Sequence, residues 1–215
     1  AKGDKKYLRE VEVFSALKDW LNDGNSARSF DCDEDDAAII AAAELLSLKP
    51  VIYAANLDED GFSDPEAVPY YRLVEERAAA QGAQVIPVCA KLEAEIAELD
   101  AEEKKMFLDD LGVAESGLDR LVKASYTLLG LISYLTSGED ECRAWTIRRG
   151  TKAPQAASKI HSDFERGFIR AEVVSYDDLM ACGSMAAARE KGLIRSEGKE
   201  YIVQDGDIIL FRFNV

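Results

Sequence analysis

A polar segment that could read a purine base follows an apolar run in the first third of the chain. Residues 51–55 are apolar, and Asn56, Leu57, Asp58 and Glu59 come directly after them. An asparagine side chain can both donate and accept, so it can hold a purine edge and tie neighbouring loops, while a backbone N–H and C=O beside it can read an adenine amino group. Open α/β sheets bind ligands where their strands end. The segment therefore indicates a base-recognition site, although these residues alone favour a solvated turn.

The phosphate loop that normally accompanies such a site has no counterpart in this sequence. A cradle of the form G-x-x-x-x-G-K-[ST] needs glycines for its backbone N–H groups and a lysine for the β- and γ-phosphates. Gly112 and Gly117 have the spacing, but Leu118 and Asp119 stand where lysine and serine or threonine are required. The residues that bind Mg²⁺ are equally missing. We therefore predict no catalytic residue and no Mg²⁺ ligand here, and expect that this chain alone cannot hydrolyse a nucleotide by that mechanism.

The other candidates for chemistry favour structural roles. His161 is the single histidine, and its neighbours Ile160 and Phe164 indicate a helix end packed on a sheet rather than a general base. We expect Trp20 and Trp145 to be core or interface anchors. We expect a group of carboxylates to lie on the solvated face of one helix: Glu93, Glu95, Glu98, Asp100, Glu102 and Glu103.

Cysteine usage and hydropathy predict a cytoplasmic protein without a membrane partner. The four cysteines lie far apart and form no C-x-x-C pair, so the sequence predicts no metal site and reduced, mostly buried thiols. No stretch approaches the roughly 18 apolar residues that cross a bilayer, and no apolar region follows the charged N-terminal residues.

Basic residues are concentrated in one segment of an otherwise acidic chain. The chain has 26 Lys and Arg against 41 Asp and Glu, a net charge of −15, which argues against a protein that simply coats nucleic acid. Residues 143–170 nonetheless carry seven basic side chains and only two acidic ones. So uneven a distribution indicates contact with a phosphate backbone, against the alternative of a scattered solvated surface. The candidates are Arg143, Arg148, Arg149, Lys152, Lys159, Arg166 and Arg170.

Hydrophobic spacing predicts the elements that position these residues. It indicates a helix over 5–22 that needs a partner helix, and a second helix over 37–48 preceded by acidic residues. Apolar runs at 51–55 and 85–90 predict parallel strands, too few for a stable sheet of that kind. The expected helices after 51–55 cover about 65–81, 92–110 and 117–136, the first capped by Asp64 before Pro65. Residues 138–141 are the predicted linker to a C-terminal module.

The C-terminal module has the outline of a small β-grasp domain. Its residues predict a strand, a short helix, a second strand and a glycine-containing turn before a last strand that ends at Phe211 and Phe213. The runs GTKAPQAASKIHSDFERGFIRAE at 150–172 and YIVQDGDII at 201–209 resemble the TGS domain of the YchF / Obg-like ATPase family. The run KPVIYAANLDED at 49–60 is similar to the same family's base-recognition segment. Two matches in the right order make the resemblance specific.

The resemblance implies a fold and a function. The fold class is α/β, the C-terminal part of a P-loop NTPase domain with a coiled-coil helix, followed by a β-grasp (TGS) domain. Residues 1–48 would be the distal part of the coiled-coil insertion, 49–138 the C-terminal part of the nucleotide-binding domain, and 139–215 the TGS domain. The intact protein would bind ATP, or less well GTP, with Mg²⁺, hydrolyse it slowly, and bind the ribosome and ribosomal RNA without DNA specificity.

The resemblance also assigns residues to the nucleotide. Asn56, Leu57 and Glu59 would recognise the base, and Glu59 stands where GTP-specific relatives place an aspartate that accepts two hydrogen bonds from guanine. The longer glutamate would misplace that acceptor. Residues 88–91, Val-Cys-Ala-Lys, are similar to the last nucleotide loop of such folds, so the backbone N–H groups of Cys89 and Ala90 are further candidates. A plain strand-to-helix connection explains those letters equally well.

Two other classes of function stay open from the sequence. The chain could be a non-enzymatic RNA- or ribosome-binding adaptor whose α/β part is only scaffold, or a regulatory module that senses a ligand. The resemblance implies that the basic segment contacts ribosomal RNA, with Arg166 and Arg170 as the first residues to test. The acidic residues between 31 and 36 have no counterpart that we can place in the family, which leaves the function of the first 49 residues open.

Overall fold

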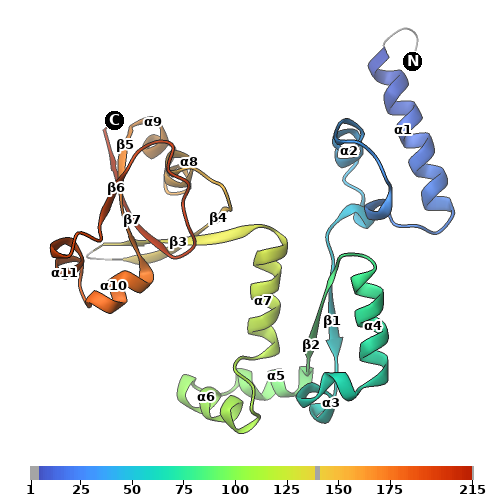
Figure 1. Ribbon diagram of the computed structural model, residues 1–215, viewed down its shortest axis with the longest axis horizontal. Coiled ribbons are helices and arrows are strands. Elements are labelled where there is room, and N and C mark those ends of the chain that lie inside the picture. Colours follow the sequence, from blue (N-terminus) through green and yellow to red (C-terminus); the bar gives the residue numbers. More distant parts are fainter. Residues whose placement is uncertain (1–4, 139–140, 215) are drawn as a thin grey trace. The chain divides into compact units, whose positions relative to one another are not determined.

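The computed structural model describes residues 5–138 and 141–214, with the side chains of residues 5 and 6 left aside. The chain divides into two compact units, Ala1–Ala124 and Ser125–Val215. Figure 1 shows helices and a short parallel sheet in the first unit and a larger sheet with helices in the second. Within the described part of the chain, no helix has the length and apolar character required to span a bilayer.

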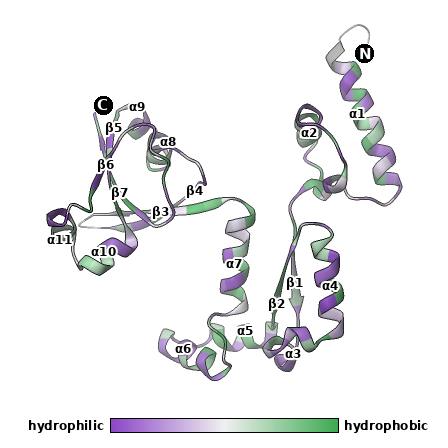
Figure 2. Ribbon diagram, viewed as in Figure 1, coloured by the Kyte–Doolittle hydropathy of each residue, from purple (hydrophilic) through white to green (hydrophobic). Residues whose placement is uncertain are grey.

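The first unit begins with the expected amphipathic helix α1 (Lys5–Asn22). Val13 and Leu17 on α1 are buried together with Ala27 and Ile40, and Trp20 packs against this cluster as expected of an anchor. In Figure 2 hydrophobic and hydrophilic residues alternate along α1. Not all of its apolar residues are covered, since the side chains of Tyr7, Leu8, Val11 and Phe14 are exposed.

The second helix differs from its predicted range of 37–48. Helix α2 (Glu34–Ala41) begins earlier because Asp33 caps it, accepting a hydrogen bond from the Asp36 backbone N–H at 2.9 Å. Three acidic residues therefore form its first turn. The helix stops before residue 42, Glu44 has a φ of 48°, and a 3-10 turn η2 (Leu46–Leu48) follows. The buried carboxylate of Asp36 is paired with Arg9 of α1 at 2.5 Å.

The two predicted parallel strands are confirmed. Strand β1 (Ile52–Asn56) pairs with β2 (Gln84–Val88) so that Ile52 lies opposite Gln84 and Asn56 opposite Val88. Because parallel strands need a crossover connection, the intervening residues form the short helix α3 (Glu59–Ser63), a 3-10 turn η3 (Pro65–Ala67) and helix α4 (Pro69–Ala79), with α4 beside the strands in Figure 1.

Two expected helices of this unit are subdivided. The helix predicted over about 65–81 is confirmed over Pro69–Ala79 as α4, but its predicted start is wrong, since residues 65–67 form the 3-10 turn η3 and the Asp64 side chain makes no capping hydrogen bond. The helix predicted over 92–110 is two helices, α5 (Ala90–Ala97) and α6 (Ala101–Asp110). Asp100 causes the break, because its side chain accepts from the N–H groups of Glu102 and Glu103 while Glu103 accepts from the Asp100 N–H.

The helix predicted over 117–136 ends early and is followed by a strand. Helix α7 covers Gly117–Leu128, Gly130 takes a φ of 62°, and β3 covers Leu131–Ser137. Glycine adopts that left-handed conformation without strain, which ends the helix. Strand β4 (Cys142–Arg148) pairs antiparallel with β3. Strands β3 and β4, on either side of the predicted linker 138–141, thus belong to one sheet. Part of that linker lies outside the described residues, and the domain boundary there stays a prediction.

The second unit is built on a five-stranded mixed sheet in the order β4-β3-β7-β5-β6. The central strand β7 runs parallel to β3 and antiparallel to β5. The sheet thus includes β3, which precedes residue 139. The remaining bounds are β5 (Phe168–Ser175), β6 (Arg195–Glu197), β7 (Asp207–Phe213), α8 (Ala153–Ser158), α9 (Ser162–Arg166), α10 (Tyr176–Cys182) and α11 (Met185–Glu190).

The core of the second unit lies between this sheet and α8. Ala153, Ala156 and Ala157 of α8 are fully buried, and such small side chains allow the helix to approach the sheet closely. Tyr134 on β3 is also fully buried, and its hydroxyl donates to the Ala156 carbonyl at 2.9 Å. Burial raises the pKa of Tyr134 because the ionised phenolate would be poorly solvated there. Trp145 packs against the same core, as expected.

Candidate base-recognition loops and basic surface

Asn56 lies where β1 and β2 end, at the carboxyl edge of the parallel strands (Figure 1). Its side chain is exposed, and Oδ1 accepts a hydrogen bond from the Ala90 N–H at 3.0 Å. Ala90 is the first residue of α5, so this contact satisfies a backbone donor that the helix itself leaves free. The structure therefore brings Asn56 and Ala90 together and joins the two loops that follow the strands.

Leu57, which follows Asn56, and Cys89, which precedes Ala90, both have structural roles. The Leu57 N–H donates to the Val88 carbonyl at 2.8 Å, so it extends the strand pairing and is occupied. Cys89 is 1% exposed and packs with Phe62 and Leu92, so its thiol is a core group. The Cys89 carbonyl accepts from the Glu93 N–H at 2.9 Å, and a backbone carbonyl has two lone pairs, so it can accept a second hydrogen bond from a ligand.

Glu59 is paired with a lysine that sequence reasoning left without a role. Lys91 Nζ lies 2.5 Å from Glu59 Oε1, and both side chains are at least half exposed. Hydrogen bonding to the Glu59 carboxylate raises the pKa of Lys91. Asp58 has a structural role, since it caps α3 by accepting from the Gly61 N–H at 2.8 Å. Lys91 is the last residue of the run Val-Cys-Ala-Lys at 88–91, and its place in that run was the signal in the sequence that it belongs to the site.

The acidic residues expected on one solvated helix face have more specific contacts. Glu93 Oε1 accepts from the Gly117 N–H at 2.6 Å and ties α5 to the start of α7. Asp100 and Glu103 form the capping box of α6. Gly117 is thus a helix start held by Glu93, so the glycine pair at 112 and 117 is not a phosphate cradle. Among residues 5–138 and 141–214, no group of three or more His, Cys, Asp or Glu side chains could hold a metal ion.

His161 begins a helix and is not packed on the sheet. Its Nδ1 accepts from the Asp163 N–H at 3.2 Å, which makes His161 the cap of α9. The His161 side chain is 62% exposed because the capping geometry keeps the ring at the surface. Its neighbours Ile160 and Phe164 pack against the core of this unit, as the prediction of a helix end packed on a sheet requires. The four cysteines are free, and Cys142 is exposed rather than buried as expected.

The seven predicted basic residues differ in their local partners. Lys152 pairs with Glu200 at 2.5 Å, and Arg166 pairs with Asp163 one helical turn away. Arg143 lies over the ring of Trp145, with the guanidinium carbon 4.3 Å from the ring centroid. Within the described part of the chain, only Lys152, Arg166 and Arg170 of the seven make an ion pair within 4.0 Å, and four make none: Arg143, Arg148, Arg149 and Lys159. These contacts leave the predicted surface with several cations held in place and others free to meet a ligand.

Arg170 belongs to a second group of arginines that sequence reasoning missed. A cavity of about 460 Å³ is lined by Arg170, Arg189, Arg195 and Arg212 together with Glu172. Glu172 lies 3.1 Å from both Arg170 and Arg212 and 3.6 Å from Arg189. Hydrogen bonding to Arg212, followed by Arg170, lowers the pKa of Glu172 against the opposing effect of partial burial. We call these four arginines the arginine cluster.

Strand pairing explains why the arginine cluster could not be seen in the sequence. Arg170 on β5 lies opposite Arg212 on β7, and Glu172 lies two residues further along the same strand, on the same face. Strand β6 places Arg195 opposite Val173. Arg195 is also held by the Tyr201 hydroxyl at 3.0 Å. Three arginines therefore contact the Glu172 carboxylate, although they come from residues as far apart as 170 and 212. The fourth, Arg195, lines the same cavity and is paired with Asp207 at 3.5 Å and Glu197 at 3.8 Å.

These features define a mixed α/β protein with polar loops at the ends of its parallel strands and an arginine-rich site on a second sheet. Residues 131–214 match the family YchF-GTPase_C, described as a protein of unknown function (DUF933). The chain is 54% identical over 212 residues to "Ribosome-binding ATPase YchF" of Bacillus subtilis and 43% identical over 215 residues to "Obg-like ATPase 1" of Gallus gallus, with 99% of this chain covered in each case. The chain belongs to the YchF / Obg-like ATPase family, which confirms the resemblance.

A solved structure agrees with this family. The "Structure of the Schizosaccharomyces pombe YchF GTPase" superimposes with a TM-score of 0.82 at 33% identity, over 97% of this chain and 55% of that one. The chain spans 58% of the length of the Bacillus relative and 54% of the Gallus relative. The activity and partners of a whole protein are therefore a matter for proposal.

Proposed function

We propose that this chain supplies the base-recognition loops and the ribosome-binding domain of a cytoplasmic ATPase that prefers ATP to GTP. The observation that carries the proposal is the hydrogen bond from the Ala90 N–H to Asn56 Oδ1, which joins the loops after β1 and β2. The names of the relatives, ribosome-binding ATPase and Obg-like ATPase, support the same function. In this proposal Asn56, Leu57 and Glu59, with the backbone at Cys89 and Ala90, surround the purine.

The hydrogen-bonding state of the loop supports a preference for adenine. Guanine offers two donors on one edge, which a free carboxylate can accept together, but Glu59 is paired with Lys91 at 2.5 Å. The Leu57 N–H is occupied by Val88 and cannot donate to the guanine carbonyl. An adenine amino group needs only an acceptor, and the loop carbonyls can provide it. The hydrogen-bonded Leu57 N–H and the ion-paired Glu59 carboxylate thus disfavour guanine more than adenine.

The residues of this chain fit the base of a nucleotide and not its phosphates or metal. Asn56 is exposed at the strand ends, where a purine edge can reach it. We propose that the phosphates and Mg²⁺ are bound by regions of the intact protein outside this chain, because the relatives are longer. ATP with Mg²⁺ would supply the scissile phosphate anhydride, and this chain would orient the base.

A pair of substitutions in the intact protein tests the base site. Asn56→Asp keeps the acceptor for the Ala90 N–H but loses the side-chain donor, so we expect ATP affinity to fall about tenfold, the scale of one hydrogen bond to the ligand. Glu59→Asp shortens the carboxylate away from Lys91 and should raise GTP affinity relative to ATP several-fold. Calorimetry with both nucleotides measures each effect.

Glu76→Asp is the matched control, since Glu76 is an exposed acid on α4. It should change neither affinity by more than about twofold, as expected of a surface substitution. Unchanged ATP binding in Asn56→Asp, with an unchanged thermal midpoint, would show that Asn56 only ties the loops and that the base lies elsewhere.

We further propose that the sheet of residues 131–214 is a TGS-type β-grasp domain that binds ribosomal RNA. The arginine cluster supports this, because guanidinium groups bind phosphates with paired hydrogen bonds. Its four arginines outnumber the three carboxylates that pair with them, Glu172, Glu197 and Asp207. Glu172 positions the guanidiniums and leaves an excess of positive charge. Arg143, Arg148, Arg149, Lys152, Lys159 and Arg166 stay candidates for additional phosphate contacts.

Reversal of one charge in the arginine cluster tests this proposal. Arg189 is the least restrained member, with a 67% exposed side chain and one ion pair at 3.6 Å, so Arg189→Glu should leave the fold intact. Loss of one phosphate contact and its replacement by repulsion should weaken co-sedimentation with ribosomes about tenfold. Lys191→Glu, at an exposed residue just after α11, makes the same change in net charge. Equal loss in both variants would refute a specific site.

An adaptor without enzymatic activity is the second candidate. It is favoured by the observation that the arginine cluster is formed entirely by residues between 131 and 214. The base-recognition loops belong to the other compact unit. Under that function, nucleotide addition and Asn56→Asp would leave ribosome binding unchanged. A nucleotide-dependent change in co-sedimentation would favour the ATPase.

A further inference from the structure

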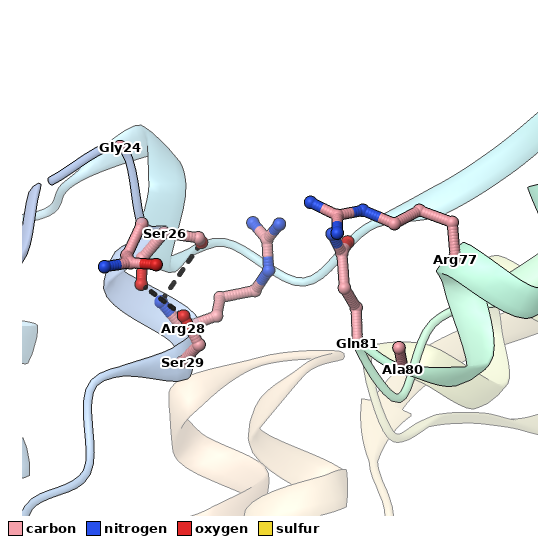
Figure 3. Close-up of a pocket in the computed structure, with 8 residues that line it drawn as sticks. Gly24, Ser26, Arg28, Ser29, Arg77, Ala80 and Gln81 are labelled. Atoms are coloured by element: carbon pink, nitrogen blue, oxygen red, sulfur yellow. Dashed lines mark hydrogen bonds between the residues drawn. The ribbon is translucent and has the colours of Figure 1, made fainter.

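A cavity of about 430 Å³ lies in the first unit beside the turn that follows α1. Its wall includes Ser26, Arg28 and Ser29 on one side and Arg77 and Gln81 at the end of α4 on the other. Figure 3 shows the guanidinium groups of Arg28 and Arg77 and the amide of Gln81 pointing toward a common space. None of the residues assigned to base recognition lines it.

Arg28 is fixed in place by backbone carbonyls. Its Nη1 donates to the carbonyl oxygens of Ser47 at 3.1 Å and Lys49 at 2.8 Å. Those contacts use one of its terminal nitrogens, and a guanidinium carries five N–H donors. The side chain is half-buried and positioned before any ligand arrives. It can therefore present its other donors to an anion at little cost in conformational entropy.

The opposite wall supplies donors of the same kind. Gln81 Oε1 accepts a hydrogen bond from the Tyr53 hydroxyl at 2.7 Å, which fixes the acceptor end of the amide and leaves its NH₂ group as a donor. Arg77 makes neither an ion pair nor a side-chain hydrogen bond with any residue in 5–138 or 141–214. The guanidinium groups of Arg28 and Arg77 and the NH₂ group of Gln81 thus supply hydrogen-bond donors to the same cavity.

The charge of this cavity is opposite to that of the chain. Its lining holds two arginines and no carboxylate, whereas the chain has 41 acidic and 26 basic residues. Convergent guanidiniums bind phosphate dianions through charge-assisted and often bidentate hydrogen bonds. The volume lies within the range of small-molecule sites, about 300–1,000 Å³, and exceeds that of one phosphate group.

We infer that this cavity is a binding site for a small molecule that bears a phosphate group, distinct from the base-recognition loops and from the arginine cluster. The phosphate would lie between Arg28 and Arg77 and accept from the Gln81 amide. The rest of the ligand would occupy the remaining volume beside Ser26 and Ser29. The inference does not depend on the proposed nucleotide or ribosome binding, because the three sets of residues are separate.

Calorimetry of the 215-residue chain with pyrophosphate at low ionic strength tests the inference. Arg77→Gln removes a guanidinium without breaking any contact given above and should weaken binding about tenfold, the scale of one charge-assisted hydrogen-bonded pair. Arg77→Lys should recover part of the affinity. Arg72→Gln is the matched control on α4, because Arg72 is exposed, does not line the cavity, and donates to the Glu66 carbonyl at 2.7 Å. It should bind pyrophosphate like the wild type.

Further outcomes separate this site from the others. No pyrophosphate binding by the wild-type chain, or equal weakening by Arg72→Gln and Arg77→Gln, overturns the inference. So does a loss in Arg195→Gln with none in Arg77→Gln, since the anion would then occupy the arginine cluster. If Arg77→Gln weakens binding of a single-stranded RNA and not of pyrophosphate, the cavity contacts a nucleic-acid backbone and the small-molecule site is refuted.

Discussion

Tyr201 links a buried carboxylate to the arginine cluster. Its hydroxyl donates to Asp207 Oδ2 at 2.7 Å, and Arg195 Nη2 donates to the same hydroxyl at 3.0 Å. Burial, followed by the nearby Asp207 carboxylate, raises the pKa of Tyr201 to about 12. In the unfolded chain a tyrosine has a pKa of about 10. The folded state therefore holds this proton more tightly, and the resulting stabilisation is complete below about pH 10 and is lost as the pH rises toward 12.

Tyr201→Phe should remove this pH dependence. Thermal unfolding from pH 9 to 12 should show a smaller loss of midpoint in the variant than in the wild type, with lower stability at pH 9 because the Asp207 carboxylate loses one donor. Tyr176→Phe, at a half-exposed tyrosine, is the control and should follow the wild-type curve. If the thermal midpoint of Tyr201→Phe fell with pH as steeply as that of the wild type, another group would cause the loss of stability at alkaline pH.

At the residue scale, the sequence predicted where a residue lies in its element better than it predicted which side chain that residue contacts. Asn56 was expected at the end of a strand as a tie between loops, because an amide after a buried apolar run has that geometry available, and the contact with Ala90 has this form. The pairing of Glu59 with Lys91 joins residues 32 positions apart and depends on how α3 and α5 are placed. Hydrophobic periodicity has no information on such a contact.

Gly167 is required where the start of β5 meets the end of β7. It follows α9 and precedes β5, and its carbonyl accepts from the Asn214 N–H at 2.9 Å just beyond β7. A Cβ atom at Gly167 would lie 2.2 Å from the Asn214 carbonyl oxygen and 2.8 Å from its carbon. Because these are backbone atoms, the strand end would have to move.

Gly167→Ala should therefore lower the free energy of unfolding by about 1–3 kcal/mol, the usual cost of overpacking. Gly198→Ala is the matched control, since a Cβ atom there meets nothing within 4 Å. It should be neutral or slightly stabilising, because alanine restricts the unfolded chain. Urea denaturation measures both. A Gly167→Ala variant as stable as the control would show that the end of β7 is free to shift.

At the element scale, residues that begin or end helices account for most of the differences between the predicted and the observed element bounds. The strands β1 and β2 were predicted because each is a short apolar run bounded by polar residues. The run after Gly130 is just as apolar, but it was read as the end of a helix, since short apolar runs have no period that separates helix from strand. Asp100 likewise interrupts a sequence of good helix formers. Capping by Asp100 and the positive φ of Gly130 decided both cases locally.

The charge of the whole chain sets how its binding to RNA must respond to salt. A chain of net charge −15 is repelled by a phosphate backbone at long range, so binding must rely on local groups such as the arginine cluster. Each neutralised phosphate releases a counterion, so the logarithm of the binding constant falls linearly with the logarithm of the salt concentration, with a slope of nearly one per contact.

Removal of one contact should therefore change the slope as well as the affinity. For Arg189→Gln we expect the slope for ribosome binding between about 50 and 200 mM salt to be smaller by about one than that of the wild type. Arg77→Gln makes the same change in total charge at the separate cavity near α1, so its slope should equal the wild-type slope. Co-sedimentation at several salt concentrations gives all three slopes. If both variants shift the slope equally, net charge governs the association and the arginine cluster has no special place in it.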